Sequence, residues 1–342
     1  MAQGGRRGHC GRCGQKTAPC PLPPFMRRLL VILVLLLVLL ALPLLCRRPP
    51  EPVIYDIAVF NTVGQLTLWN VDQHTADCIA REVIAELQQL HNCLNLFDPA
   101  SEVARLNQAS PGEFFRCSDI LWKILMVAKE AHQLTDGIFD ITVGPLMRLW
   151  GFHRKRDSLP TADEVNLTLE KVGFQKLRFE EETQSIAFSR AGMSLDFGGL
   201  AKGFALDIIR PLIEKQGCRS YMLNLGGNIY CSTEPPPRRQ AFQIGIRDPA
   251  DPNKIIRMLA LRDRCISTSA NYERALQIGE RKIGHLLDPR TGYPVERSGS
   301  ATIITACGAW SDAFSTAIFV AGPELAQQLS KQVPGTEFIF LP

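Results

Sequence analysis

The chain carries little net charge, and its excess of positive charge lies at one end. The formal charge is +4 over 342 residues. Part of it precedes residue 49, in Arg6, Arg7, Arg12, Lys16, Arg27, Arg28, Arg47 and Arg48. The remaining body is close to neutral, so the composition implies no basic face of the kind that nucleic acids bind. We therefore expect no nucleic-acid partner.

Both standard glycine-rich phosphate motifs are also missing. The most glycine-rich stretch, Ser194–Asp207 (SLDFGGLAKGFALD), matches neither G-x-x-x-x-G-K-[ST] nor G-x-G-x-x-G. The pattern still predicts a strand that ends near Leu195 and a helix that begins near Ala201. The first N–H groups of such a helix favour an anion, and Lys202 adds a positive charge. A tight turn with a solvated lysine is the alternative.

The cysteines form no recognisable framework. There are eleven of them, and Cys10 and Cys13 form a lone C-x-x-C, which is a weak metal signal. Seven scattered cysteines follow Cys46: Cys78, Cys93, Cys117, Cys218, Cys231, Cys265 and Cys307. An odd number without regular spacing excludes a disulfide scaffold, so we expect several of them to be small core residues.

One long apolar run, Leu29–Leu45, is flanked by arginine pairs. Its seventeen residues lie between the core of a signal peptide, about 7–15 residues, and a spanning helix, about 17–25. Basic residues are denser before the run than after it. We therefore expect residues 1–28 to form a cytoplasmic basic tail and the body to be exported to the periplasmic side of the inner membrane.

Cys46 directly follows this run and resembles a lipoprotein acylation site, although Leu45 stands where lipoproteins usually carry a small residue. Residues 29–46 are thus predicted to be either an uncleaved transmembrane anchor or a lipoprotein signal. Residues 47–54 form a proline-rich, semi-rigid spacer. Either reading tethers the body, residues 55–342, at a membrane surface.

The body mixes helical and strand patterns without strict alternation, which predicts an α+β architecture, mixed sheets with packed helices in two lobes. Apolar spacing predicts helices over His74–Asn95, Ser118–Leu134 and Ala201–Lys215, the last with Pro211 inside it and Gly217 after it. Thr161 and Glu164 predict a capping box. Further helices are expected at 309–322 and 323–332. Strands are expected at 55–72 on either side of Gly64, and at 176–197, 221–231, 241–248, 254–268, 300–306 and 336–341.

Two stretches carry side chains suited to catalysis. In WSDAFSTAIF, Asp312 and Thr316 are four residues apart on one helical face, and together they suit a hard cation such as Mg²⁺. The alternative is that Thr316 bonds to the helix backbone while Asp312 favours the helix start. In GHLLDPRTGYP, His285 precedes the turn at Asp288, and it is either a general base or a hydrogen-bonded structural residue.

Two other stretches have simpler interpretations. Thr135–Phe152 is an apolar run punctuated by Gly137, Asp140 and Thr142, and its aromatic residues could stack on a flat ligand or fill a core. Gly226-Gly227 is typical of a hairpin turn.

Together these stretches resemble the ApbE family, the FAD:protein FMN transferases once called thiamine biosynthesis lipoproteins. The resemblance covers nearly all of residues 55–342. The matching segments, in family order, are SEVARLN (101–107), GIFDITVGPLMRLWGF (137–152), LDFGGLAKGFALD (195–207), NLGGNI (224–229), IGIRDP (244–249), STSANYER (267–274), HLLDPRTGYP (285–294) and SDAFSTA (311–317).

The resemblance implies an ApbE-like, T-fold-like catalytic domain that uses Mg²⁺ and takes FAD as its substrate. A threonine or serine hydroxyl of a partner protein attacks the FMN phosphorus, AMP leaves, and FMN stays attached through a phosphoester. The implied acceptor is a flavoprotein subunit of a membrane electron-transfer complex. Two alternatives remain: an Mg²⁺-dependent FAD pyrophosphatase, in which water replaces the hydroxyl, and a non-catalytic FAD-binding lipoprotein.

The resemblance also assigns residues to roles. Asp312, Thr316 and the carbonyl of Ala201 would hold the metal, while His285, as the base, and Asp288 would be catalytic. The implied FAD-binding set is Asn107, Asp140, Lys202, Asp207, Asn224, Gly226, Gly227, Glu273, His285, Asp288 and Thr291. Two departures from the family pattern are Val63-Gly64-Gln65, where Met-Gly-Thr is frequent, and Ala270-Asn271, where glycine is frequent.

Overall fold

The computed structural model describes residues 23–45, 51–251, 253–271 and 275–342, and it describes the side chains of the first segment in part. Residues 1–22 of the predicted cytoplasmic tail, Cys46, residues 47–50 of the spacer and Glu273 therefore lie outside the described residues. The chain divides into two compact units, residues 1–49 and 50–342, and each is considered by itself.

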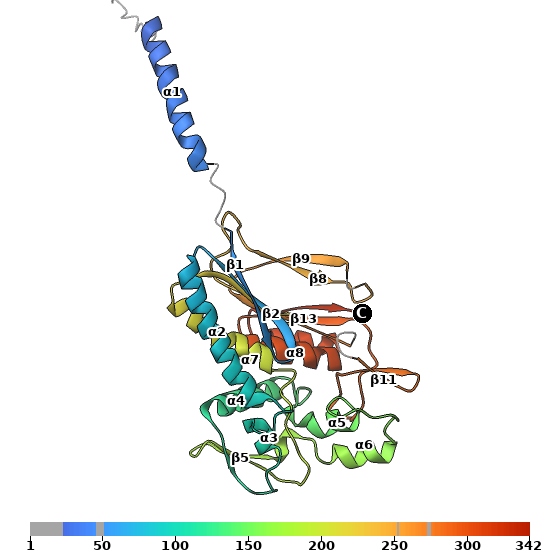
Figure 1. Cartoon of the computed structure of the whole chain (residues 1–342). Coiled ribbons are helices and arrows are strands. Elements are labelled where there is room, and N and C mark those ends of the chain that lie inside the picture. The colour runs from blue at the N-terminus through green and yellow to red at the C-terminus, as the bar shows by residue number, and fades with distance from the viewer. Residues whose placement is uncertain (1–22, 46–50, 252, 272–274) are drawn as a thin grey trace, which may run out of the picture. The chain divides into compact units, whose positions relative to one another are not determined.

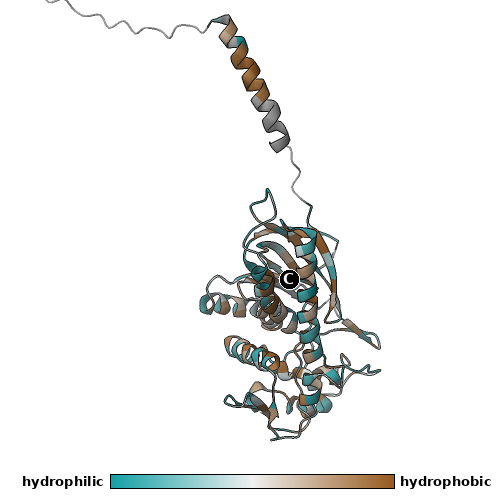
Figure 2. Cartoon of the chain, turned by 60° about the vertical axis from the view of Figure 1, so that its left-hand side comes forward, coloured by the Kyte–Doolittle hydropathy of each residue, from teal (hydrophilic) through white to brown (hydrophobic). Residues whose placement is uncertain are grey.

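The first unit contains helix α1 (Pro24–Leu45), which includes the apolar run. Figure 2 colours the described residues along the middle of this helix as hydrophobic. Among the described residues, no helix has both the length and the apolar composition needed to cross a bilayer.

The second unit is built on a seven-stranded antiparallel sheet (Figure 1). The strand order is β1 (Val53–Val59), β2 (Thr62–Trp69), β6 (Ser220–Leu225), β7 (Asn228–Cys231), β10 (Arg264–Ala270), β13 (Ser300–Thr305) and β14 (Glu337–Leu341). Because side chains alternate along a strand, neighbouring residues reach opposite faces. Ile303 thus joins the main core, while Ile304 joins a smaller apolar cluster on the other face.

Each face of this sheet has its own cover. Four helices pack on the main-core side: α2 (Gln73–Leu94), α7 (Ala201–Lys215), α8 (Gly308–Ala321) and α9 (Pro323–Gln332). A two-stranded ribbon, β8 (Phe242–Arg247) and β9 (Ile255–Leu261), covers the opposite face through Phe242, Ile244 and Ile246. Figure 1 shows the ribbon and helices α7 and α8 on opposite sides of the sheet.

A second region lies between α2 and α7 in the sequence and consists mostly of short elements. Its helices are α3 (Glu102–Leu106), α4 (Asp119–Leu134), η1 (Ile141–Val143), α5 (Gly144–Leu149), α6 (Ala162–Leu169) and η2 (Phe174–Lys176). A three-stranded sheet has the order β3 (Phe115–Arg116), β5 (Ser185–Phe188), β4 (Leu177–Glu180). The hairpin β11 (Ala275–Ile278) and β12 (Arg281–Gly284) packs with α5 and α6 in a small apolar cluster.

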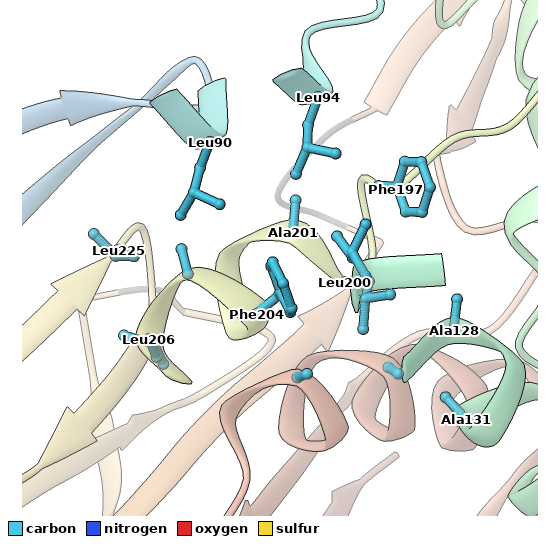
Figure 3. Packing of buried hydrophobic residues seen from close by; sticks show 14 of the residues in the cluster. Leu90, Leu94, Ala128, Ala131, Phe197, Leu200, Ala201, Phe204, Leu206 and Leu225 are labelled. Carbon is cyan, nitrogen blue, oxygen red and sulfur yellow. The ribbon is translucent and has the colours of Figure 1, made fainter. Parts of the chain in front are cut away.

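One hydrophobic core links the two regions. Figure 3 shows Leu200, Ala201 and Phe204, at the start of α7, among side chains from α2 and α4. The mixed α+β architecture is confirmed. The two expected lobes share this core, so residues 50–342 form a single compact unit.

Several elements appear where the sequence predicts them, and two predictions are wrong in detail. The expected helix Ala201–Lys215 is α7, and Thr161 and Glu164 form the predicted capping box. The first hairpin turns at Phe60 and Asn61, and Gly64 lies within β2 rather than in the turn. Glycine is required at position 64 because a side chain there would meet the carbonyl oxygen of Asn224 on β6. No strand ends near Leu195: β5 ends at Phe188, and an irregular loop leads into α7.

Candidate active site

Asp312 and Thr316 lie one turn apart on α8, next to the first turn of α7. Asp312 is 4% exposed, and its Oδ2 accepts a hydrogen bond from the backbone N–H of Gly203 at 3.0 Å. Lys202 Nζ lies 3.6 Å from the same oxygen, and it also donates to the carbonyl of Gly198 at 3.4 Å. Lys202 is therefore an ion-pair partner of Asp312 rather than only a solvated lysine, and the two helices meet at this carboxylate.

The close approach of α7 and α8 depends on a pair of glycines. A Cβ atom at Gly203 would overlap the carbonyl oxygen of Gly308 and would lie 2.7 Å from Asp312 Cβ. A Cβ at Gly308 would in turn overlap the carbonyl oxygen of Gly203. Only residues without side chains fit this crossing, and the crossing brings the α7 backbone to Asp312.

Asp207, one of the predicted FAD ligands, holds the start of α8. Its two carboxylate oxygens accept hydrogen bonds from the backbone N–H groups of Gly308 at 2.7 Å and Ala309 at 2.8 Å. The N–H groups at the start of a helix have no acceptors within that helix. Asp207, on α7, provides the acceptors for these two. Burial raises the pKa of Asp207 above its usual range, and the two backbone hydrogen bonds oppose that shift. Its contacts thus fix the position of α8.

Hydroxyl groups join α8 to strand β10. Ser267 Oγ lies 2.6 Å from Ser311 Oγ, and Ser269 Oγ lies 2.9 Å from Ser315 Oγ. Ser269 Oγ also lies 3.3 Å from Thr316 Oγ1, which orients the predicted metal ligand from the strand. The alternative role for Thr316 was a hydrogen bond to its own helix backbone. In the structure it is the neighbouring Ser315 that makes such a bond, by donating to the carbonyl of Asp312.

The loop that leads into α7 is held from two other segments. Asn107 bonds to both backbone groups of Leu195, accepting from its N–H at 2.7 Å and donating to its carbonyl at 3.0 Å. Asp196 Oδ1 accepts from the N–H of Gly198 at 2.7 Å, and His153 Nε2 donates to Asp196 Oδ2 at 2.8 Å. Asn107 thus shapes this loop through its contact with Leu195.

His285 directly follows β12, and the residue before it packs against the end of β10. A Cβ atom at Gly284 would overlap the side chain of Asn271, which lies two residues beyond Ser269 in the sequence. The side chain of His285 is half-buried.

Asp288 lies in the next turn, with an arginine as its partner. Arg290 donates to Asp288 from Nε at 2.9 Å and from Nη2 at 2.7 Å. Burial alone would raise the pKa of Asp288, but the hydrogen bonds from Arg290 outweigh it, and the pKa lies below its usual value. Thr291 is exposed on the same turn, and Trp150 Nε1 donates to the carbonyl of Gly292 at 2.8 Å, which ties the turn to α5.

The remaining predicted FAD ligands lie in two further places. Gly226 and Gly227 form the predicted hairpin turn between β6 and β7, with φ of 60° and 94°, and Asn224 accepts from the N–H of Gly227 at 2.8 Å. Asp140 is buried and accepts from Thr142 at 2.8 Å and from the N–H of Phe174 at 2.9 Å, so its visible role is to cap η1.

Sequence reasoning missed His153 as a partner of the loop. His153 is remote from Asp196 in the sequence. It lies in a loop rich in arginine and lysine, where no motif distinguishes a histidine from its basic neighbours. Asp196 itself lay within the glycine-rich stretch without an assigned role. Nothing in the local pattern of either residue indicated the contact.

The three predicted metal ligands are of a kind that suits a hard divalent cation. Asp312 has a carboxylate, Thr316 a hydroxyl and Ala201 a backbone carbonyl; Mg²⁺ prefers such oxygen ligands and usually completes its shell with water and substrate phosphates. Lys202 already shows that a positive charge is accommodated beside Asp312. Among the described residues, no group of three or more His, Cys, Asp or Glu side chains could hold a metal. Any ion bound here would thus depend on one carboxylate.

Comparison with known proteins identifies one family. The ApbE family model matches residues 55–340. An FAD:protein FMN transferase of Klebsiella pneumoniae is 29% identical over 291 residues, covering 84% of this chain and 88% of that protein. A second, from Vibrio cholerae, is 28% identical over 261 residues, covering 74% of this chain and 77% of that protein.

Solved structures give the same result. The ApbE protein of Thermotoga maritima superposes with a TM-score of 0.77 at 26% identity, covering 85% of this chain and 94% of that chain. The flavin transferase ApbE of Vibrio cholerae gives a TM-score of 0.75 at 25% identity, with the same coverage of 85% and 94%. Since the family model spans almost the whole body, this chain belongs to the ApbE family.

Proposed function

We propose that this protein is an FAD:protein FMN transferase that attaches FMN through a phosphoester to a threonine or serine of an acceptor flavoprotein. The observation that carries the proposal is the meeting of α7 and α8 at Asp312, with Thr316 one turn away, inside a fold whose relatives bear that name. Phosphoryl transfer needs charge neutralisation and positioning, and this site offers both.

The reaction is a substitution at the FMN-side phosphorus of FAD. The acceptor hydroxyl oxygen forms the new P–O bond, the bond to the bridging oxygen breaks, and AMP leaves with that oxygen. His285 takes the proton of the hydroxyl. Positioning of the hydroxyl and removal of its proton by a side chain typically lower the barrier by several kcal/mol.

In this proposal Asp312, Thr316 and the Ala201 carbonyl hold one Mg²⁺, which neutralises charge on the diphosphate when it is bound. Ser269 orients Thr316 through their 3.3 Å contact, and the α7–α8 crossing fixes Asp312. Lys202 supplies a second positive charge at the same place. Asn224, Gly226, Gly227, Asp288 and Thr291, with the other FAD residues that the sequence predicts, line the binding site for FAD.

The test separates the transferase from a pyrophosphatase and from a non-catalytic FAD-binding protein. Purified protein is incubated with FAD and Mg²⁺, with and without candidate flavoprotein subunits, and covalent flavin is detected by fluorescence in denaturing gels. A transferase labels an acceptor and releases AMP in equal amounts. Rapid release of FMN and AMP without any acceptor would favour the pyrophosphatase, and FAD that stays intact would favour simple binding.

We also propose that residues 29–46 tether the body on the periplasmic side of the inner membrane, where subunits of membrane electron-transfer complexes serve as acceptors. Support comes from the apolar run itself and from the basic residues, which are denser before the run than after it. Protease treatment of intact spheroplasts tests the location, because an exported body is digested and a cytoplasmic one is protected.

A further inference from the structure

A basic cavity lies next to the loop that enters α7. It has a volume of about 400 Å³ and is bounded by α5, α6 and the turn after β5. Five cationic side chains line it, namely Arg148, Arg154, Lys155, Arg156 and Lys171. Among the described residues, no Asp or Glu lines it. We call it the basic pocket.

Most of this charge has no counter-charge within the described protein. Arg156 forms an ion pair with Glu164 on α6, with Nη2 2.8 Å from Oε2. No carboxylate of the described residues forms an ion pair with Arg148, Arg154, Lys155 or Lys171. Cations gathered around one cavity repel each other, and an anion that enters relieves that repulsion. The pocket therefore favours an anionic ligand.

The form of the pocket favours a chain with several carboxylates over a small anion. Sites for single phosphates use preorganised donors, such as backbone N–H groups at a helix start or fixed arginine forks. Here Arg148, Arg154 and Lys155 are exposed, and the start of α6 is already occupied by the Thr161–Glu164 capping box. Exposed cations of this kind provide electrostatic attraction and orientation over a wide surface.

The pocket also lies beside the proposed reaction site. His153, between the pocket residues Leu149 and Arg154 in sequence, donates to Asp196 at 2.8 Å. Gly192 lines the pocket two residues before Ser194, where the loop into α7 begins. A peptide bound in the basic pocket is thus close to the loop that leads to Ala201 and Lys202 at the start of α7.

We propose that the basic pocket docks an acidic segment of the acceptor protein, one with several Asp or Glu residues near the hydroxyl that receives FMN. This inference rests on the proposed function, since only a transferase has a protein acceptor. The pocket then contributes to the choice of acceptor, while the α7–α8 site carries out the transfer.

The test uses a fluorescein-labelled decapeptide of alternating glutamate and glycine as the probe, and the full chain in detergent as the protein. Fluorescence anisotropy measures the affinity at low and at physiological salt. We expect binding that weakens steeply with salt, because charges separated by more than about 8 Å are screened at physiological ionic strength. The double variant Arg154→Glu with Lys155→Glu is expected to bind at least about tenfold more weakly.

A matched variant controls for net charge. Lys215→Glu with Lys331→Glu makes the same charge change at two exposed helix ends outside the pocket, and it should alter peptide affinity less than about twofold. Equal weakening by both double variants would overturn the proposal. Tight binding of inorganic phosphate that displaces the peptide would identify a small-anion site instead. Binding to phosphatidylglycerol vesicles without binding to the peptide would identify a membrane contact.

The transferase assay distinguishes a failure of this inference from a failure of the proposed function. Once an acceptor protein is identified, the Arg154→Glu/Lys155→Glu variant should show a higher KM for that acceptor and an unchanged affinity for FAD. A variant that transfers FMN with the KM of the parent protein would disprove the docking role while the transferase function stands. A parent protein that binds the peptide but never transfers FMN would disprove the proposed function.

Discussion

His153 donates a hydrogen bond from Nε2 to Asp196 Oδ2 over 2.8 Å, and Asp196 in turn accepts from the backbone of Gly198 at 2.7 Å. Both side chains of the pair are largely buried, with 15% and 10% of their surface exposed. The contact joins the segment after α5 to the loop that enters α7. It therefore fixes the backbone just before Ala201 and Lys202.

His153→Ala removes the donor and leaves a buried carboxylate without one of its partners. We expect the free energy of unfolding to fall by about 1–3 kcal/mol, because the buried carboxylate of Asp196 would lose a hydrogen bond that offsets the cost of removing it from water. FAD affinity should fall several-fold as the loop loosens. Urea unfolding and FAD fluorescence titration measure the two effects. His153→Gln keeps a donor and should recover part of both, and no recovery would argue against a positioning role.

Asp312→Ala should abolish FMN transfer while leaving the fold intact. The carboxylate is the charged ligand of the proposed Mg²⁺ site, and metal stabilisation of a transition state is worth several kcal/mol, about a thousandfold in rate. Transfer rates over a range of Mg²⁺ concentrations measure the loss, and circular dichroism checks the fold. Thr316→Val, a nearly isosteric change, should reduce transfer less. Full activity in Asp312→Ala would disprove the metal assignment.

His285→Gln tests the proposed base. Loss of a general base typically lowers kcat by about 10²–10⁴-fold. FAD affinity should change little, since the amide keeps a polar side chain of similar reach. An unchanged kcat in this variant would exclude His285 from this role.

Gly203→Ala introduces a methyl group where α7 crosses α8. The new Cβ would overlap the carbonyl oxygen of Gly308, so the helices must move apart. Such overpacking typically costs about 1–3 kcal/mol, and it would also displace Asp312. Urea unfolding measures the first effect, and the transfer assay measures the second. Lys215→Ala, at the exposed end of the same helix, serves as the control and should be close to neutral.

Alkaline pH should destabilise the protein through its buried thiols. Burial raises the pKa of Cys231 from 9.0 to about 12, so the thiol stays neutral in the folded chain while it ionises in the unfolded chain. Its stabilising contribution is complete below about pH 9 and is lost as pH rises toward 12, by up to about 1.4 kcal/mol per pH unit. Urea unfolding under reducing conditions at pH 8, 9.5 and 11 should show this decline, and Cys231→Ala should show a weaker one.

Local pattern was enough to place much of the secondary structure. The helix from Ala201 to Lys215 appears with the predicted bounds, because its apolar spacing and the following Gly217 are signals within a few residues. The capping box at Thr161 and the hairpin turn at Gly226-Gly227 are equally local. The prediction of a strand that ends near Leu195 was wrong for the opposite reason. Its backbone groups bond to Asn107, which lies 88 residues away, rather than to a neighbouring strand.

Motifs in a fixed order were enough to predict the family and the α+β class, because they need no coordinates to be recognised. Which side chains meet became visible in the folded molecule alone. It placed Lys202 against Asp312, gave Asp207 to the start of α8, and paired His153 with Asp196. The first two contacts join residues more than one hundred positions apart, and the third joins residues 43 positions apart. The packing of helices α7 and α8 on the sheet, rather than spacing in the chain, brings the first two together.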